Sequence, residues 1–457
     1  MNRNVISKLC PRNRCIRHFF LAFFLLFCIA SPAWPANWYV SQTGSGAKNG
    51  TDPANAWNIF SIDWGTGGVE PGDTLYVVGT ITGAFNIMGS GSTDNYITIT
   101  EYDSSTSMPD IEFYGADWIK LTNLKINGKI SLRNGLSENV WLDHLTIDGL
   151  GNTYIVRLFE CNYVRVSYCT ITNGGNGIWN NQPMGGADNY VTIDHCVLTD
   201  FSGDGDSHCI GFYNGGEHWL IEYNDLSYAN TGITLYGSNI SNNIIRYNNI
   251  HHMEASRSTA TQRGYGIGFE GSSSSRTGNY IYGNIIHSCT GNDESSMQAA
   301  GIRTLLNSNA NYIYNNTVYD CSPNFEIQYL LIGGVVQPTG GIFKNNISIS
   351  PNDSSGAAYQ CHVCVSSNTQ GYSGLEFNNN LYYPDGSTLF GIGGSRYNFA
   401  DWKDALIARS IAGADANSLV ADPLFTNASG SYDNVSDFTL KKDSPAIDKG
   451  EITLYDQ

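Results

Sequence analysis

A short pattern of apolar and polar positions recurs along most of the chain. It consists of an apolar residue, two variable residues, Asn, one variable residue and a second apolar residue. The best copies are IEYNDL, IRYNNI, IYGNII and IYNNTV, with looser copies FKNNIS and EFNNNL. Upstream copies carry Leu or Cys in place of Asn. The aligned column is Leu124, Leu145, Cys169, Cys196, Asn224, Asn248, Asn284, Asn316, Asn346 and Asn379.

A second strand recurs between these copies and usually opens with Gly-Ile, as at 177–178, 232–233, 266–267 and 301–302. The segments are short, rich in β-branched and aromatic residues, and bounded by Gly and Asn, without a helical period. Repeats 21 to 36 residues long with variable inserts predict a β-solenoid. We expect Asn to take the left-handed bend between sheets and its amides to bond from coil to coil. One amphipathic helix is expected at 399–409.

The pattern resembles the right-handed parallel β-helix proteins of the pectin-lyase-like superfamily. The resemblance covers about residues 37–450 and includes PGDTLYV at 71–77 and DSPAID at 443–448. It implies an all-β solenoid of about ten or more coils with an N-terminal cap. The scaffold hosts lyases, hydrolases, epimerases, phage tailspikes and adhesins, so it does not select an activity. A six- or seven-bladed β-protein is the alternative fold, which the uneven repeat length disfavours.

The N-terminus predicts export. Five cations and no acid precede residue 37, and an apolar run of about twelve residues is typical of a signal peptide. We therefore predict a signal peptide at 1–33, a β-helix domain at 34–395, and a C-terminal helix and tail at 396–457 that packs on the solenoid. Since no later apolar run is long enough for a membrane span, we expect a secreted or periplasmic monomer that is not inserted in a membrane.

The charge composition limits the classes of ligand that the protein is expected to bind. Only 14% of residues are charged, and the net charge is −17. This excess of acids argues against binding to nucleic acid. It also favours a neutral glycan, or an acidic one bridged by a metal, over direct uptake of a polyanion.

Side chains at equivalent positions of successive coils should touch, because strands lie about 4.8 Å apart. This predicts a ladder of stacked rings and two pairs of neighbouring core thiols. We interpret the thiols as buried and free, although the spacing would also permit disulfides, and Cys361-x-x-Cys364 as a local disulfide or an inert loop. The rings belong to His144, Tyr168, His195, Tyr223 and Tyr247, and the thiol pairs are Cys169 with Cys196 and Cys289 with Cys321.

The best candidate site is the polar insert that leads into the strand at Cys209-Ile210. Equivalent positions two residues before the Ile are Asn176, His208, Thr231, Tyr265 and Ala300. The candidate catalytic residues are His208, Arg303, Asp206 and Glu270, the candidate substrate-binding residues are Arg263, Tyr265, Tyr236 and Tyr213, and the candidate Ca²⁺ ligands are Asp204 and Asp206. Carboxylates, a histidine, arginines and tyrosine rings in one groove are typical of a site for an extended polysaccharide.

Two reactions fit these residues. For β-elimination from a uronic-acid polymer, which we favour, His208 or an arginine would be the base, and Arg303, Arg263 or Ca²⁺ would neutralise the carboxylate. For hydrolysis, Asp206 and Glu270 lie two coils apart, roughly 9–10 Å along the stack, near the upper end of the inverting range, but in different columns, so their separation stays open. The catalytic motifs of pectate lyases, polygalacturonases and alginate epimerases are missing. A tight polar turn in a non-catalytic glycan-binding or surface-structural protein therefore remains an alternative.

Overall fold

The computed structural model describes residues 34–180, 188–203, 206–257, 263–270, 277–291, 298–306, 311–329, 331–332, 335–336, 341–357, 359–367, 371–427 and 434–451. The predicted signal peptide, residues 1–33, lies outside this range. No helix in the described ranges has the length and apolar character needed to cross a bilayer. The division at residue 395 stays a prediction.

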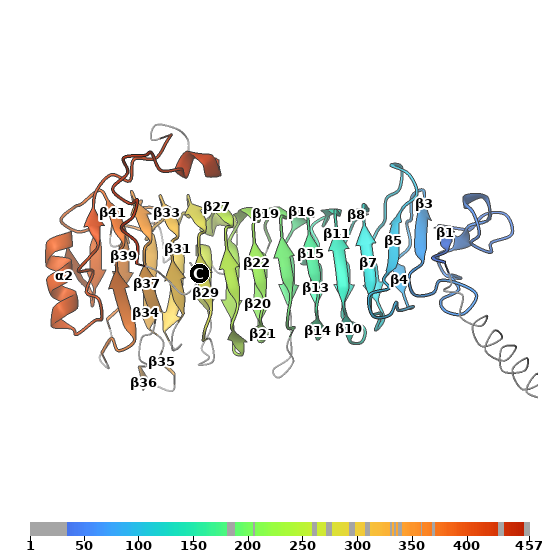
Figure 1. Ribbon diagram of the computed structural model, residues 1–457, viewed down its shortest axis with the longest axis horizontal. Helices are drawn as coiled ribbons and strands as arrows, with labels where there is room; N and C mark the ends of the chain where they lie inside the picture. The colour runs from blue at the N-terminus through green and yellow to red at the C-terminus, as the bar shows by residue number, and fades with distance from the viewer. Residues whose placement is uncertain are drawn as a thin grey trace, which may run out of the picture. The chain divides into compact units, whose positions relative to one another are not determined.

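Three long sheets, with strands between Asn37 and Val420, run along the molecule (Figure 1). Sheet 1 holds the first strand of each coil, and its neighbours pair in parallel and in register. Within the described residues its strands are β1 (Asn37–Ser41), β2 (Trp57–Asn58), β3 (Thr74–Val78), β5 (Ile97–Glu101), β7 (Ile119–Thr122), β11 (Val140–Asp143), β15 (Arg165–Ser167), β18 (Thr192–Asp194), β22 (Leu220–Glu222), β26 (Ile244–Arg246), β29 (Tyr280–Tyr282), β32 (Tyr312–Tyr314), β37 (Gly341–Lys344) and β40 (Leu375–Asn378).

Sheet 2 follows Sheet 1 after a bend of two residues, and its neighbours are also parallel. Its described strands are β8 (Lys125–Asn127), β12 (Thr146–Asp148), β16 (Thr170–Gly174), β19 (Val197–Phe201), β23 (Asp225–Ala229), β27 (Asn249–Met253), β30 (Ile285–His287), β33 (Thr317–Tyr319), β38 (Ile347–Ile349), β41 (Leu381–Tyr383) and β44 (Leu419–Val420).

Sheet 3 contains the Gly-Ile strands and closes each coil. All its neighbours are parallel except the final pair, β42 with β43. Its described strands are β4 (Phe85–Ile87), β6 (Ile111–Phe113), β9 (Ile130–Leu132), β13 (Tyr154–Leu158), β17 (Asn176–Asn180), β20 (His208–Tyr213), β24 (Thr231–Tyr236), β28 (Arg263–Glu270), β31 (Gln298–Leu306), β34 (Phe325–Tyr329), β39 (Val363–Val365), β42 (Phe390–Ile392) and β43 (Ser395–Tyr397).

The remaining elements are short. They are the strand pairs β10 (Ser137–Glu138) with β14 (Cys161–Asn162), β21 (Gly216–Glu217) with β25 (Ile240–Ser241) and β35 (Leu331–Ile332) with β36 (Val335–Val336), the 3₁₀ helices η1 (Pro53–Asn55), η2 (Ala255–Arg257) and η3 (Val435–Phe438), and the helix α2 (Phe399–Ala408). Because each coil passes through the three sheets in turn and then pairs in parallel with the next, the fold is the predicted right-handed parallel β-helix. Isoleucine, leucine and valine side chains at equivalent strand positions fill its core.

The bend between Sheets 1 and 2 confirms the amide ladder but corrects two details. Each Asn side chain from Asn224 to Asn346 bonds to the next, and the last step, from Asn346 Nδ2 to Asn380 Oδ1, is 3.1 Å. The final rung is therefore Asn380, and our assignment of Asn379 was one residue out. The left-handed residue is also the one before the ladder position, for example Tyr223 with φ 56°.

The ring ladder is confirmed at every step. Successive centroids of His144, Tyr168, His195, Tyr223 and Tyr247 lie 4.8 to 5.2 Å apart, and all four pairs are stacked. The two core thiol pairs are also in contact, Cys169 with Cys196 and Cys289 with Cys321. All eight cysteines of the described ranges are free thiols.

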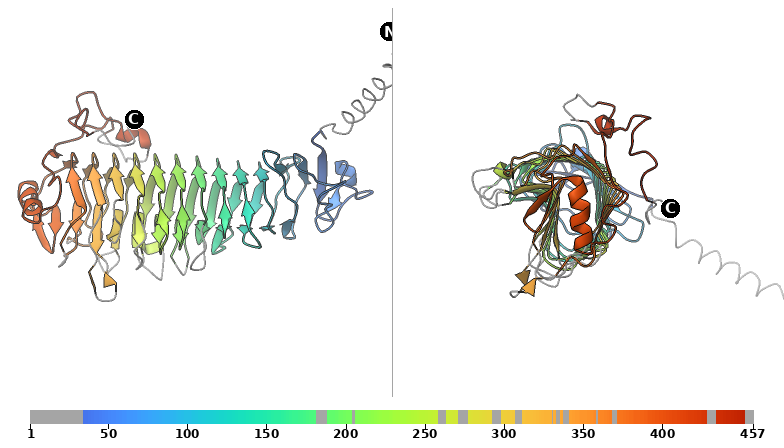
Figure 2. Two further views of the ribbon diagram at one scale, coloured as in Figure 1. Left: turned by 60° about the horizontal axis from the view of Figure 1, so that its bottom comes forward. Right: turned by 90° about the vertical axis from the view of Figure 1, so that its left-hand side faces the viewer.

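Helix α2 covers the C-terminal end of the solenoid, as the end-on view in Figure 2 shows. Its Trp402 is fully buried, stacks on Phe390 with ring centroids 5.5 Å apart, and donates from Nε1 to Asp415 Oδ2 at 2.7 Å. The predicted helix at 399–409 is thus confirmed. The tail beyond it returns to Sheet 2, where Phe438 packs against His287 and Tyr319.

Candidate functional site

A local irregularity turns His208 toward the outer face of Sheet 3. Strict alternation would give His208 and Ile210 the same orientation. However, Cys209 and Ile210 are both fully buried in the core. The equivalent position in the next coil, Gly232, also faces the core, since a Cβ added there would lie 2.6 Å from the Ile250 side chain. Two consecutive residues therefore face inward, and the residue before them faces outward.

The outward side chains of four neighbouring strands, β13, β17, β20 and β24, together with Glu270 of β28, enclose a pocket of about 300 Å³. That volume is at the lower end of the range for small-ligand sites. The pocket is lined by Thr153, Tyr154, Asn176, Trp179, Asp206, His208, Tyr213, Thr234, Tyr236 and Glu270. It brings together five of the predicted site residues: Asp206, His208, Tyr213, Tyr236 and Glu270.

His208 is fixed on two sides. Its ring stacks on Trp179 with centroids 4.9 Å apart, and its Nδ1 lies 2.7 Å from Thr234 Oγ1. Burial, and secondarily the positive charge of Arg263, lower the pKa of His208 to about 3. The imidazole is therefore neutral at ordinary pH and holds a proton poorly. A ring with so low a pKa is a weak proton acceptor.

The two carboxylates of the pocket have different surroundings. Glu270 is 3% exposed and its Oε2 forms an ion pair with Arg263, whereas its Oε1 has no hydrogen-bond partner in the described residues. Asp206 also has a buried oxygen, Oδ1, without such a partner. Burial raises the pKa of Asp206, and Arg263 opposes that rise only in part. Burial thus disfavours the charged form of Asp206, whereas the ion pair with Arg263 favours the charged form of Glu270.

Aromatic rings form the walls. Tyr213 and Tyr236 stack with centroids 4.9 Å apart, and Trp179 lies beside Tyr154 and Tyr213 at 6.1 and 6.2 Å. A Cβ on Gly211 would come within 1.9 Å of the Trp179 ring, so only glycine leaves room for the indole. Flat rings with polar groups beside them suit the apolar face and the hydroxyls of a sugar.

Arg303 and Tyr265 do not line this pocket. Arg303 lies over the Tyr265 ring, 4.8 Å from its centroid, and its Nε is 3.4 Å from Glu326 Oε2. Tyr265 is fully buried. Both belong to the next coils of the same face, since Gly268 of β28 pairs with Arg303 of β31.

The predicted Ca²⁺ site stays a prediction, because Asp204 lies outside the described residues. Within those residues no group of three or more His, Cys, Asp and Glu side chains is placed to hold a metal ion. The sequence prediction omitted Trp179 and Thr234. Both occupy the position after Ile in their strands, equivalent to Gly211 and Arg303. The glycine at 211, which leaves room for the Trp179 ring, was the feature of the sequence that could have indicated this part of the pocket.

No protein-family model and no curated protein sequence matches this chain. Among solved structures it is similar to pectate lyase Pel9A, with 12% identity over 93% of this chain and 94% of that chain and a TM-score of 0.47. It is also similar to the GH136 lacto-N-biosidase from Eubacterium ramulus, with 11% identity, coverage of 73% and 66%, and a TM-score of 0.46.

A third similar structure is the A-module of Azotobacter vinelandii mannuronan C-5 epimerase AlgE4, with 11% identity, coverage of 77% and 91%, and a TM-score of 0.48. Similarities at this level say nothing about the activity of this chain. The paired sheets define a right-handed parallel β-helix protein, the fold that its resemblance to the pectin-lyase-like superfamily implied.

Proposed function

We propose that this protein is an exported enzyme that hydrolyses a glycosidic bond of an extended glycan in the pocket on Sheet 3. The proposal rests on one observation. Two carboxylates, Asp206 and Glu270, line one aromatic-walled pocket, each has a buried oxygen without a partner in the described residues, and their charges are stabilised to different degrees. Carboxyl pairs whose surroundings separate their pKa values are the usual acid and base of glycosidases.

In this mechanism Asp206 is the acid and Glu270 the base. Protonated Asp206 donates its proton to the oxygen that leaves with one part of the glycan. Glu270 takes a proton from a water molecule, whose oxygen attacks the anomeric carbon from the opposite side. Asp206 and Glu270 reach the same pocket from positions two coils apart, and they stand in different columns because Glu270 is in register with Tyr213. A water held between the two carboxyl groups would give inversion at the anomeric carbon.

Three features support hydrolysis over β-elimination, which the sequence had favoured. The pKa of His208 is lowered to about 3, so it is a weak base. Arg263 and Arg303, the cations expected to neutralise a uronate, are already paired with Glu270 and Glu326. The chain carries a net charge of −17, which opposes a polyanionic substrate.

The test is to incubate the protein with a panel of neutral glycans and polyuronates while following reducing ends and the ultraviolet absorbance of unsaturated uronates. Hydrolysis predicts new reducing ends without absorbance, and loss of turnover in Glu270→Gln while the glycan still binds. New ends accompanied by absorbance would establish β-elimination instead. Binding of a glycan with no new ends across the panel would establish the non-catalytic alternative.

A further inference from the structure

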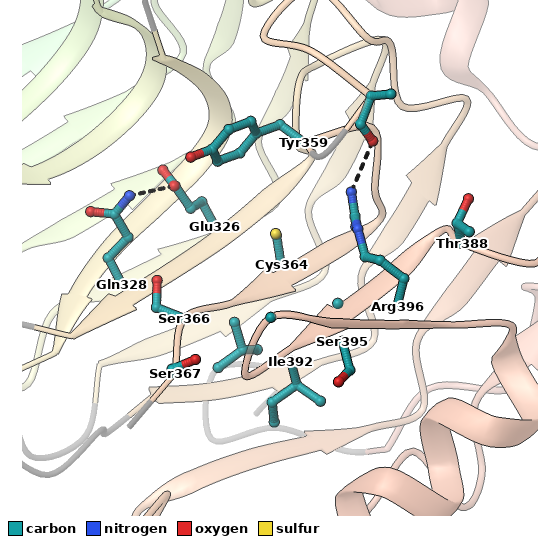
Figure 3. A pocket seen from close by; sticks show the side chains of 14 residues that line it. Glu326, Gln328, Tyr359, Cys364, Ser366, Ser367, Thr388, Ile392, Ser395 and Arg396 are labelled. Carbon is teal, nitrogen blue, oxygen red and sulfur yellow. Dashed lines mark hydrogen bonds between the residues drawn. The ribbon is translucent and has the colours of Figure 1, made fainter. Parts of the chain in front are cut away.

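A second, larger cavity lies farther along the same outer face of Sheet 3 (Figure 3). Its volume is about 900 Å³, and its walls come largely from β34, β39, β42 and β43. We call it the distal cavity. Its lining residues include Glu326, Gln328, Cys364, Ser366, Thr388 and Arg396. None of these belongs to the pocket that holds Asp206 and Glu270.

Strand register links the two cavities. Thr234, Gly268, Arg303 and Glu326 occupy one column on four successive strands. Three steps of strand spacing separate Thr234 from Glu326, or about 14 Å along the solenoid. A chain of a few sugar residues covers such a distance, so a single extended glycan is able to reach both cavities.

One wall of the distal cavity is a buried carboxylate held by neighbours. Glu326 is 3% exposed, and burial raises the pKa of its carboxyl despite the opposing charge of Arg303. Gln328 Nε2 donates to Glu326 Oε1 at 2.5 Å, and Arg303 Nε lies 3.4 Å from Oε2. Oε2 has no true hydrogen bond in the described residues. A fixed carboxylate with a free acceptor position suits the hydroxyl of a sugar.

The facing wall is built around a glycine. Gly391 pairs with Cys364 on one side and with Arg396 on the other. A Cβ at Gly391 would lie 3.1 Å from Arg396 Nη1 and 3.5 Å from Cys364 Sγ. Because Gly391 has no side chain, the guanidinium of Arg396 can pack against its backbone. Arg396 Nη2 donates to Ala357 O at 3.1 Å. Figure 3 shows Ser366, Ser367 and Ser395 along the rim.

We propose that the distal cavity is a second binding site for the same glycan, which holds a stretch of chain a few sugar residues away from the bond that is cleaved. The inference rests on the proposed function, since it assigns one polymer to both cavities. It adds that the substrate is long, with affinity contributed at a distance from the reacting bond. Such remote contacts raise affinity for long chains without taking part in the chemistry.

Cys364 offers a direct measure of occupancy. It is the one cysteine of the described ranges that is not buried, and it lines the cavity. A hydrogen bond from Cys361 and the charge of Arg396 lower its pKa, which favours the reactive thiolate. After mild reduction, the rate of Cys364 alkylation by iodoacetamide would be measured with and without disaccharides and long oligosaccharides from the hydrolysis panel. We expect long chains to slow alkylation at least several-fold.

A blocking variant tests the same site by kinetics. Ser366→Trp would fill the cavity, so we expect KM for long chains to rise about tenfold, the cost of roughly 1.4 kcal/mol of lost binding. The rise should disappear for disaccharides, which cannot reach the cavity. Ser104→Trp places the same ring on an exposed turn and is the matched control.

The two proposals fail separately. Protection of Cys364 without cleavage of any glycan would retain the distal site and overturn the hydrolase. Cleavage of long chains with neither protection nor a change of KM in Ser366→Trp would retain the hydrolase and overturn the distal site. Neither protection nor cleavage across the panel would overturn both.

Discussion

Two groups of polar side chains on this solenoid, the amide ladder and the pocket on Sheet 3, differ in how completely they are paired. In the amide ladder, Asn284 accepts from the backbone N and the Nδ2 of Asn248 and donates to Asn316 Oδ1 and Ile245 O. In the pocket on Sheet 3, Asp206, Glu270 and Asn176 each keep an oxygen with no hydrogen-bond partner in the described residues.

We interpret fully hydrogen-bonded polar groups as stabilising the fold, and polar groups that lack a partner as available to a ligand. An unpaired buried oxygen costs about 1–3 kcal/mol, so a row that only stabilises the coil should not retain several of them. The ladder follows that rule at each of its rungs. The pocket departs from it at three residues on one face, which is why we place the chemistry there.

The largest effect is expected when the proposed acid is removed. In Asp206→Asn the proton for the leaving oxygen is lost, and we expect turnover to fall about 10³-fold, within the usual range for general acid catalysis. Because burial raises the pKa of Asp206, its charged form is disfavoured in the folded protein. The variant should therefore unfold at the same or a higher guanidinium concentration near neutral pH.

The control for that prediction is Asp200→Asn. Asp200 is 64% exposed in its side chain and pairs only at the surface with Arg257, at 3.2 Å. Its replacement should alter neither turnover nor unfolding. An Asp206→Asn protein that keeps full turnover would remove Asp206 from the mechanism.

The amide ladder should respond in the opposite way. Asn284→Ala leaves acceptors and donors of Asn248, Asn316 and Ile245 without partners, and we expect a loss of about 3 kcal/mol in the free energy of unfolding. Turnover of the folded protein should not change. Guanidinium unfolding measures the loss, with exposed Asn95→Ala as the control. An equal effect at both asparagines would show that the ladder has no special role in stability.

The pKa of His208 predicts a smaller effect that depends on pH. Its folded value, about 3, is below the unfolded value of about 6.5, so the unfolded chain binds the extra proton first as the pH falls. Stability is therefore present above pH 6.5 and is lost toward pH 3. Between neutral pH and pH 5 the loss from this group is about 2 kcal/mol.

His208→Gln should remove that part of the acid sensitivity. Gln does not titrate and retains a hydrogen-bonding group beside Thr234. His362 is a second buried histidine, with a pKa lowered by burial to about 4, and it keeps its own contribution in the variant. Unfolding curves at several pH values measure the slope. An unchanged slope in His208→Gln would show that His208 is not the source.

Much of the fold followed from the sequence because every coil repeats the same environment. The register of Asn176, His208, Thr231, Tyr265 and Ala300 is as predicted, since the Gly-Ile pair marks the same place in each strand. The last ladder rung was wrong because three consecutive asparagines, 378 to 380, fit the pattern equally well.

The site was less predictable than the fold because it depends on local irregularity. Only the inward turn of both Cys209 and Ile210 places His208 beside Trp179, and the spacing of apolar residues does not reveal it. Arg303 was predicted to share a groove with Asp206 and His208, but its charged partner is Glu326 in the following coil. A column predicts which residues are neighbours, whereas the direction of a long side chain depends on the charge beside it.

The smallest effect is expected in the ring ladder, where stacking and backbone strain oppose each other. Tyr223 is 49% exposed, stacks on His195 and Tyr247, and has a left-handed φ of 56°. Tyr223→Ala loses the stacking but keeps the strain, and should cost about 1 kcal/mol. Tyr223→Gly also relieves the strain, as Gly283 does in the next-but-one coil, so its cost should be less than half as large. Guanidinium unfolding of both variants tests this. An equal cost for Ala and Gly would show that the left-handed bend is not strained.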